Sequence, residues 1–202
     1  MSPLETLGFA LGTSFASGLN LYATVAAAGL FQRLGIVTLP EPLQVLANPV
    51  VVGVALTLFL VEFIADKIPF VDSAWDAVHT FIRPPAAALL SYSAFAGGGV
   101  PEEWKLAAAL LAGSVALTSH GAKASTRAAA NASPEPVSNW TLSLLEDGLA
   151  VFLAWMSATH PLLTAAIVVA LVVIAVIVIW KLYGYLKLGL SKLRRRPSPA
   201  GP

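Results

Sequence analysis

The run from Leu162 to Trp180 is built almost entirely of aliphatic residues and carries no charge. A helix of about 19 residues, at ~1.5 Å per residue, is about 28 Å long and matches a hydrocarbon core of about 30 Å. Tyr183 and Tyr185 follow Trp180 and complete an aromatic belt of the kind found at membrane interfaces. We therefore predict that this segment crosses a membrane.

A basic cluster follows this segment. Its members are Lys181, Lys187, Lys192 and residues 194–196, which are all arginine. By the positive-inside rule the cluster places the C-terminus in the cytoplasm. The first residues of the chain lack the basic region of a cleavable signal peptide, so we expect the first apolar segment to stay in the protein. The expected location is a bacterial inner membrane, crossed several times, with a disordered basic tail at 191–202.

The composition agrees with a membrane protein. Hydrophobic residues make up 57% of the chain and charged residues only 11%, whereas soluble domains carry about 25% charged residues. A net charge of +1 gives no reason to expect nucleic acid as a partner. Cysteine is absent, which excludes disulfides and thiolate chemistry. The three histidines lack metal-ligand spacing, so we expect no metal and no cofactor.

Apolar segments recur along the chain and predict an all-α, polytopic transmembrane helical bundle with about six membrane segments. We divide it into a first membrane repeat at 1–100 and a second at 101–190. Residues 71–82 have the pattern of an amphipathic helix lying at the membrane interface. Residues 86–95 are short for a crossing. Five full spans with a re-entrant segment are therefore the alternative, and they would place the N-terminus outside.

Polar side chains interrupt the apolar pattern between Ser119 and Asn139. Four of them, each about one helical turn from the next, share one face of an alanine-rich helix. They are His120, Lys123, Arg127 and Asn131. A basic stripe on such a helix is either a binding site or a solvated helix end, and the sequence leaves both interpretations open.

Two short segments resemble each other. Residues 17–27 align with residues 120–130, so that Gly18 matches Gly121 and the alanine pairs coincide. Each copy is followed by Pro-Glu-Pro and then an asparagine. In a six-segment protein the copies lie in segments one and four and point in opposite directions. This pattern predicts an inverted 3+3 repeat with interrupted or re-entrant helices, the plan of many transporters.

Three motifs together resemble a family of bacterial membrane proteins catalogued as domain of unknown function 4126. They are GLNLYATV, VEFIADKIPFVDSAWDAVHTFIRP and GAKASTRAAANASPEPVSNW. The resemblance covers roughly Leu4 to Tyr185. It supports the membrane class, but it implies no reaction and no catalytic residue.

The candidate binding residues come from both copies. Lys123 and Arg127, if buried, each cost about 2.5–3.5 kcal/mol and need an anionic partner or a water-filled cavity. They would bind a phosphate or carboxylate, the arginine through its fork of donors. Further donors would complete the site: Ser119, Asn131, Asn20 and Thr24. A protein carboxylate such as Glu135 is the alternative partner.

Three carboxylates inside apolar segments are candidates for coupling or gating. They are Glu62, Glu146 and Asp147. An intramembrane carboxylate is a proton or cation site by default, and an ion pair with the basic stripe is the alternative. The other acidic residues of this region are expected to be interfacial caps or solvated charges: Asp66, Asp72 and Asp76.

We expect a membrane transporter or flippase for a small anionic solute or lipid headgroup, possessing a site between two inverted halves. An ion channel with a carboxylate-lined pore and a non-transporting scaffold are the alternatives. The motifs of hydrolases, metalloproteases and nucleotide-binding loops are missing, so we expect no enzyme, with an intramembrane enzyme as the remaining alternative. The many alanine and glycine faces are compatible with a homo-oligomer.

Overall fold

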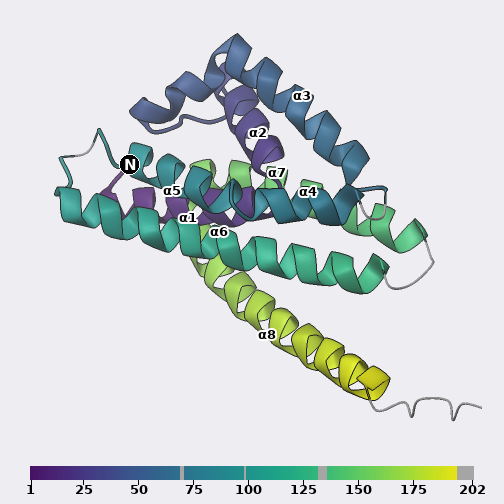
Figure 1. Ribbon diagram of the computed structural model, residues 1–202. Coiled ribbons are helices and arrows are strands. Elements are labelled where there is room, and N and C mark those ends of the chain that lie inside the picture. The colour runs from purple at the N-terminus through teal and green to yellow at the C-terminus, as the bar shows by residue number, and fades with distance from the viewer. Residues whose placement is uncertain (69–70, 98, 132–135, 195–202) are drawn as a thin grey trace, which may run out of the picture.

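The computed structural model describes residues 1–68, 71–97, 99–131 and 136–194, and every regular element in these ranges is a helix (Figure 1). This confirms the all-α prediction. The elements are α1 (Pro3–Leu19), α2 (Leu21–Arg33), the 3-10 helix η1 (Glu41–Ala47), α3 (Pro49–Ala65), α4 (Val71–His79), α5 (Arg83–Ala94), α6 (Glu102–Asn131), α7 (Pro136–Thr159) and α8 (Pro161–Arg194).

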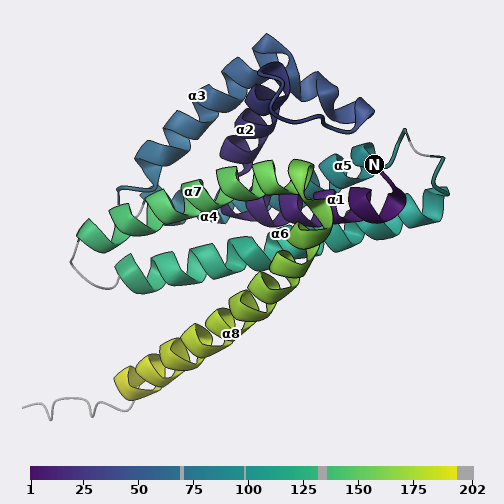
Figure 2. The same cartoon turned by 180° about the vertical axis from the view of Figure 1, so that it is seen from behind.

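Helix α1 lies in the middle of the bundle, with α5, α6, α7 and α8 packed around it (Figures 1 and 2). Twelve of its 17 residues are buried. Glycines make this close packing possible. A Cβ atom on Gly12 would lie 2.1 Å from Ser157 Oγ, and one on Gly8 would lie 2.3 Å from the carbonyl oxygen of Pro161. Small residues of this kind let membrane helices approach one another closely.

The first predicted interruption is confirmed at Asn20. Its φ of −150° and ψ of 103° are extended, so α1 ends at Leu19 and α2 begins at Leu21. The Asn20 side chain caps α2 by accepting a hydrogen bond from the Ala23 backbone N–H at 2.8 Å. After this break α2 turns away from the axis of α1 and packs with η1 and α3, while it still contacts α7 (Figure 1).

The second predicted interruption, at Gly121, is wrong, because α6 runs unbroken from Glu102 to Asn131. A single glycine costs a helix about 1 kcal/mol, and the surrounding alanines favour the helix. The six-segment inverted repeat is not confirmed either. Ser119 of α6 contacts Phe15 of α1, and Lys123 contacts Leu19. Residue numbers therefore rise together along both helices, and α1 and α6 run in the same direction.

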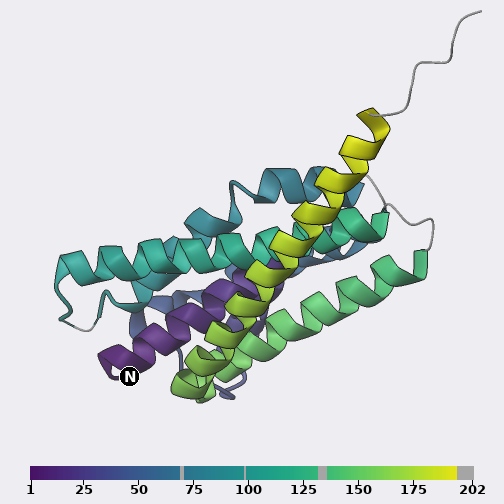
Figure 3. The same ribbon diagram turned by 90° about the horizontal axis from the view of Figure 1, so that it is seen from below.

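Within the described residues, two helices are long and apolar enough to cross a membrane, at Asn139–Thr159 in α7 and Pro161–Tyr185 in α8. A third crossing is added if η1 and α3, bent by 66°, form one span. These helices indicate a membrane protein. Only 17% of the α8 span is buried inside the protein, and Figure 3 shows α8 crossing the bundle and projecting beyond it.

The structure describes only part of the C-terminal tail that the sequence predicts to be disordered. Helix α8 continues to Arg194, so the first four residues of the segment 191–202 are helical. The rest of that segment lies outside the described residues, and so does Glu135.

Candidate functional site: a buried ion-pair network

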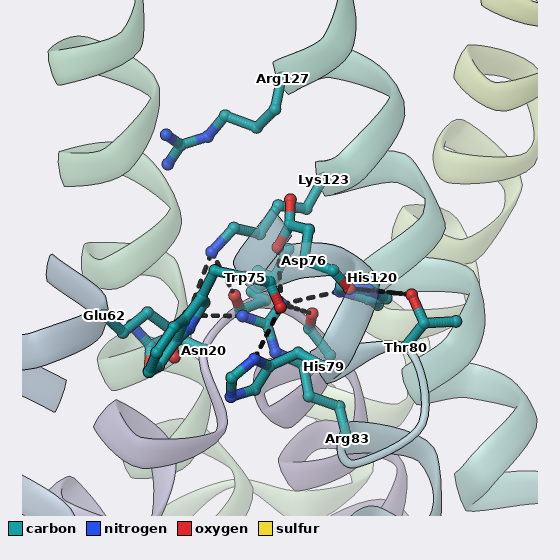
Figure 4. A network of polar contacts seen from close by, with 12 residues as sticks. Asn20, Glu62, Trp75, Asp76, His79, Thr80, Arg83, His120, Lys123 and Arg127 are labelled. Atoms are coloured by element: carbon teal, nitrogen blue, oxygen red, sulfur yellow. Dashed lines mark hydrogen bonds and ion pairs between the residues drawn. The ribbon is translucent and has the colours of Figure 1, made fainter. Parts of the chain in front are cut away.

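The polar stripe of α6 faces the interior of the protein. His120 is 1% exposed, Lys123 2% and Arg127 1%, while Asn131 at the helix end is half-buried. The alternative of a solvated helix end is therefore wrong for the first three residues. The alanines between them cover little area, so the neighbouring helices come close enough for side chains from α3, α4 and α5 to reach the stripe (Figure 4). Glu146 of α7 reaches it as well.

Three cations and six carboxylates form what we call the buried network. Its members are Arg83, Lys123, Arg127, Glu62, Asp66, Asp72, Asp76, Glu146 and Asp147. All nine side chains belong to residues that are at most 9% exposed. They come from α3 and its C-cap, α4, α5, α6 and α7, so residues far apart in the sequence meet around the C-terminal half of α6.

Lys123 has an acceptor for each of its three ammonium hydrogens. Its Nζ donates to Glu62 Oε1 at 3.1 Å and to Asp66 Oδ2 at 3.0 Å. The third acceptor is the carbonyl oxygen of Leu19, at 3.1 Å. The ammonium group is thus saturated by the protein itself.

Arg127 lies one helical turn further along α6 and is held mainly by Glu146. Its Nη2 donates to Glu146 Oε2 at 2.5 Å and to Asp66 Oδ2 at 3.1 Å. Its Nη1 donates to the Asp66 carbonyl oxygen at 2.7 Å and lies 3.7 Å from Asp72 Oδ1. Asp66 therefore connects Arg127 to Lys123 through one shared carboxylate oxygen.

Arg83 is the third cation, and sequence reasoning did not single it out. It is 0% exposed, and its Nη2 donates to Glu62 Oε1 at 2.5 Å. Its Nη1 donates to the Gly18 carbonyl oxygen at 2.9 Å and to His120 Nδ1 at 2.8 Å. A signal was present, because Asp72, Asp76 and Arg83 follow one another at intervals of 4 and 7 residues, a spacing that would place them on one face of a continuous helix.

The contact with Arg83 determines the protonation state and tautomer of the His120 ring. A guanidinium can only donate, so His120 Nδ1 must accept and carries no hydrogen. The other ring nitrogen, Nε2, lies 3.0 Å from the carbonyl oxygen of Asp76, which can only accept. His120 is therefore neutral with its hydrogen on Nε2, and it links Arg83 on α5 to the backbone of α4.

The end of α1 supplies backbone acceptors to the same cations. The break at Asn20 leaves the last carbonyls of α1 without partners inside the helix. Gly18 offers its oxygen to Arg83, and Leu19 offers its oxygen to Lys123. A helix C-terminus also carries a partial negative charge, which favours cations there. The predicted break thus contributes to the network directly.

The prediction that Asp66, Asp72 and Asp76 are solvated charges is wrong. All three are buried, and the polar face of α4 turns inward against α6 instead of towards water. The cations of α5 and α6 attract these carboxylates, which explains the inward orientation. Burial nevertheless raises the pKa of Asp76 to about 6, and it also raises the pKa of Asp72.

Four further predicted residues have smaller roles in the geometry. Asn20 Nδ2 donates to Asp147 Oδ1 at 2.8 Å, so both side chains join the edge of the network. Asn131 Nδ2 donates to Asp72 Oδ2 at 3.1 Å. Thr24 and Ser119 have backbone partners instead: Thr24 bonds within α2, and Ser119 bonds from α6 to α1.

The network contains more negative than positive groups. If every carboxylate were ionised, six negative charges would face three positive ones. Lys67 lies nearby, but its Nζ donates to the Phe63 carbonyl oxygen and to Ser143 Oγ. Three buried carboxylate oxygens have neither a hydrogen bond nor an ion pair among the described residues: Glu62 Oε2, Asp66 Oδ1 and Asp147 Oδ2. No arrangement of described His, Asp or Glu side chains fits a metal ion.

A second histidine lies beside the network and was also missed. His79 on α4 stacks on Trp75 at 4.6 Å between ring centroids, and its Nδ1 donates to the Trp75 carbonyl oxygen at 2.8 Å. Burial lowers the pKa of His79, so the ring is neutral at pH 7. Its Nε2 then accepts a hydrogen bond from the Tyr22 hydroxyl at 3.0 Å.

Helices that expose apolar residues and bury three ion-paired cations with surplus carboxylates define a helical membrane protein with an ionisable core. More particularly, the chain belongs to the family described as Domain of unknown function (DUF4126), whose family model matches residues 7–181. The match confirms the resemblance seen in the three motifs. No match was found among curated proteins or among solved structures.

Proposed function

We propose that this protein is a membrane carrier whose buried network binds protons and couples their movement to that of a solute. The observation that carries the proposal is the surplus of three carboxylates over cations in a core that is at most 9% exposed. A buried unpaired carboxylate is very costly, and binding a proton removes that cost. Ionisable groups at membrane depth commonly mark proton pathways.

The anionic solute that the sequence favoured has less support. Lys123 and Arg127 already bind Glu62, Asp66 and Glu146, so an incoming anion would have to displace one of these carboxylates. Protons need no such displacement, because several carboxylate oxygens have no partner. We therefore keep the carrier as the proposed class and assign the network to protons.

The membrane arrangement belongs to the same proposal. A multi-pass protein of the inner membrane with its basic C-terminal end in the cytoplasm would place residues 181–194 at the cytoplasmic surface. The C-terminal end of α6 and the start of α7 would then form one mouth of the carrier, where Asn139 Nδ2 donates to Asn131 Oδ1.

A proton-flux measurement in sealed liposomes tests the proposal. Purified protein is reconstituted with a trapped pH-sensitive dye, and proton entry is recorded while a panel of phosphorylated, carboxylated and uncharged solutes is added. We expect flux with at least one solute class and a loss of about ten-fold or more in Glu62→Gln. Glu103→Gln is the matched control, because Glu103 is exposed at the start of α6 and should leave flux unchanged.

Two results would remove the proposal. The first is the absence of solute-dependent proton flux across the whole panel. The second is full flux in a Glu62→Gln, Asp147→Asn double variant that is folded and inserted. Single-channel currents in planar bilayers would instead favour the alternative of an ion channel.

A further inference from the structure

An apolar pocket of about 570 Å³ has Tyr22 in its wall, and the Tyr22 hydroxyl contacts His79 beside the network. Side chains of α2, η1, α3 and α5 form its wall, including Leu46, Val54 and Leu89. Its volume falls within the range of about 300–1,000 Å³ that is usual for small-molecule sites. Helices α2, η1 and α3 bound this space together with α5.

The wall of the pocket selects against charge. None of its lining residues is ionised at neutral pH, and the only side-chain hydroxyls on it belong to Tyr22 and Ser93. An ionised ligand would lose its hydration without gaining a partner, at a cost of many kcal/mol. The pocket therefore fits an uncharged molecule with a hydrocarbon body and at most one or two polar groups.

The Tyr22 hydroxyl defines which polar group the ligand needs. His79 donates through Nδ1 to a carbonyl, so its Nε2 takes the hydrogen of the Tyr22 hydroxyl. The hydrogen of Tyr22 is thereby used, and its oxygen keeps only acceptor capacity. A ligand that donates a hydrogen bond, such as an alcohol, would satisfy that oxygen.

We propose that this pocket binds an uncharged alcohol with a hydrocarbon chain, which would be the solute of the carrier. This inference rests on the proposed function, since it names the class of solute that protons would drive. The alcohol's hydroxyl would donate to the Tyr22 oxygen while its chain contacts the aliphatic wall. Free long-chain alcohols and hydroxyl-bearing membrane lipids share this chemistry.

Tyr22 and His79 also connect the pocket to the network. Charged groups act on His79 from three neighbouring elements: Glu62 on α3, Arg83 on α5 and Lys123 on α6. A proton on His79 would make Nε2 a donor, so the Tyr22 hydroxyl would no longer point its hydrogen at His79. The same hydroxyl could then donate into the pocket. Proton binding would thus change the polar partner that the pocket offers to its ligand.

Cysteine chemistry tests the pocket cleanly, because the natural chain contains no cysteine. Ser93→Cys places a thiol on the pocket wall, and Ser114→Cys places one at an exposed position of α6 outside it. In lipid nanodiscs, the reaction rate with N-ethylmaleimide is measured with and without 1-dodecanol. We expect 1-dodecanol to slow the reaction of S93C at least five-fold and to leave that of S114C unchanged.

Two further measurements test the ligand's charge and the role of the Tyr22 hydroxyl. Dodecyltrimethylammonium, with the same chain and a fixed charge, should not protect S93C. Adding Tyr22→Phe should weaken the protection by 1-dodecanol about two- to ten-fold, as expected for one lost hydrogen bond. Repeating the measurement in nanodiscs that contain a hydroxyl-bearing lipid in place of 1-dodecanol distinguishes the two ligand sources.

The outcomes separate this inference from the carrier proposal. Equal protection of S93C and S114C would mean that the alcohol merely enters the bilayer, and it would overturn the site. Unchanged protection in Tyr22→Phe would overturn the role of the hydroxyl. Proton flux without protection refutes the pocket and leaves the carrier standing, whereas protection without flux supports the pocket and refutes the carrier.

Discussion

Helices α6 and α8 are the two longest in the protein, with 30 and 34 residues, and they distribute polarity in opposite ways. Helix α6 buries a histidine, a lysine and an arginine. Helix α8 exposes aliphatic side chains along its span, among them Val169, Val173 and Val176. Burial in this protein therefore follows the need for polar partners, because a lipid environment satisfies an aliphatic side chain but not a cation.

The largest expected effect comes from removing a cation of the network. Arg83→Met keeps an unbranched side chain but leaves His120 Nδ1 without its donor and Glu62 with Lys123 as its remaining cation. Breaking a buried ion pair costs about 3–5 kcal/mol, since an uncompensated charge stays buried. We expect thermal unfolding in detergent to show a loss of this size.

Arg33→Met is the matched control, because Arg33 is exposed and has one bond to the Ala47 carbonyl oxygen. Its stability should change by less than about 1 kcal/mol. Equal losses of stability in the two variants would show that removing a cation from the network costs no more than removing one from the surface.

The second prediction concerns α8. Val173 is 54% exposed near the middle of the apolar span, so Val173→Arg would place a charge against lipid. Insertion scales give a cost of about 2.5–3.5 kcal/mol for arginine at a helix centre. Glycosylation mapping of insertion should show a marked loss for Val173→Arg and normal insertion for Val173→Leu. Unimpaired insertion of the arginine variant would mean that α8 does not cross the bilayer.

The third prediction concerns the contact that brings the stripe of α6 against α1. A Cβ atom on Gly18 would lie 1.8 Å from Ser119 Oγ and 2.3 Å from the Ala116 carbonyl oxygen, so backbone would have to move. We expect Gly18→Ala to destabilise the protein by about 3 kcal/mol in denaturant unfolding.

Gly53→Ala on α3 is its control, because nothing lies within 4 Å of the added atom. Alanine should there be neutral or stabilising by up to about 1 kcal/mol, since it favours a helix more than glycine does. A neutral Gly18→Ala would contradict the close packing of α1 and α6.

The smallest expected effect is the pH dependence of Asp76. Its pKa of about 6 lies above the ordinary value of 3.8, so the folded protein binds more protons than the unfolded chain between these values. The stability from protonated Asp76 is complete below about pH 4 and is lost as the pH rises through about 6.

Asp76→Asn removes that dependence. The difference in unfolding free energy between this variant and the natural protein should shift in favour of the variant, on the order of 1–2 kcal/mol, as the pH rises from 4 to 7. Chemical unfolding at the two pH values measures this difference. A relative stability that stays constant, or that changes in the opposite direction, would show that Asp76 is ionised throughout this range.

The sequence was informative where a signal is local. The break at Asn20 follows from a capping residue next to glycine, and the apolar runs of α3 and α8 follow from hydropathy alone. The alanine spacing correctly placed Lys123 and Arg127 on one face. Ion pairing of these cations with Glu62 and Glu146 was one of two interpretations that the sequence left open, and the structure contains these ion pairs.

Non-local features were not predictable in the same way. The position of Arg83 depends on how α5 packs against α1 and α6. Arg83 is on a different short helix from Asp72 and Asp76, so their spacing alone does not predict that they meet. The interruption expected at Gly121 failed because a repeat in sequence does not carry its cap residue with it: Asn20 has Lys123 as its counterpart, which cannot accept a bond from the backbone.

The chain break after Leu19 has a consequence for how this core responds to acid. A carboxylate that binds a proton loses the negative charge that attracts a cation, but a peptide oxygen keeps its dipole at every physiological pH. Gly18 and Leu19 therefore hold Arg83 and Lys123 even when the carboxylates around them are neutral. These two backbone acceptors keep both basic side chains in place independently of the charge on the neighbouring carboxylates.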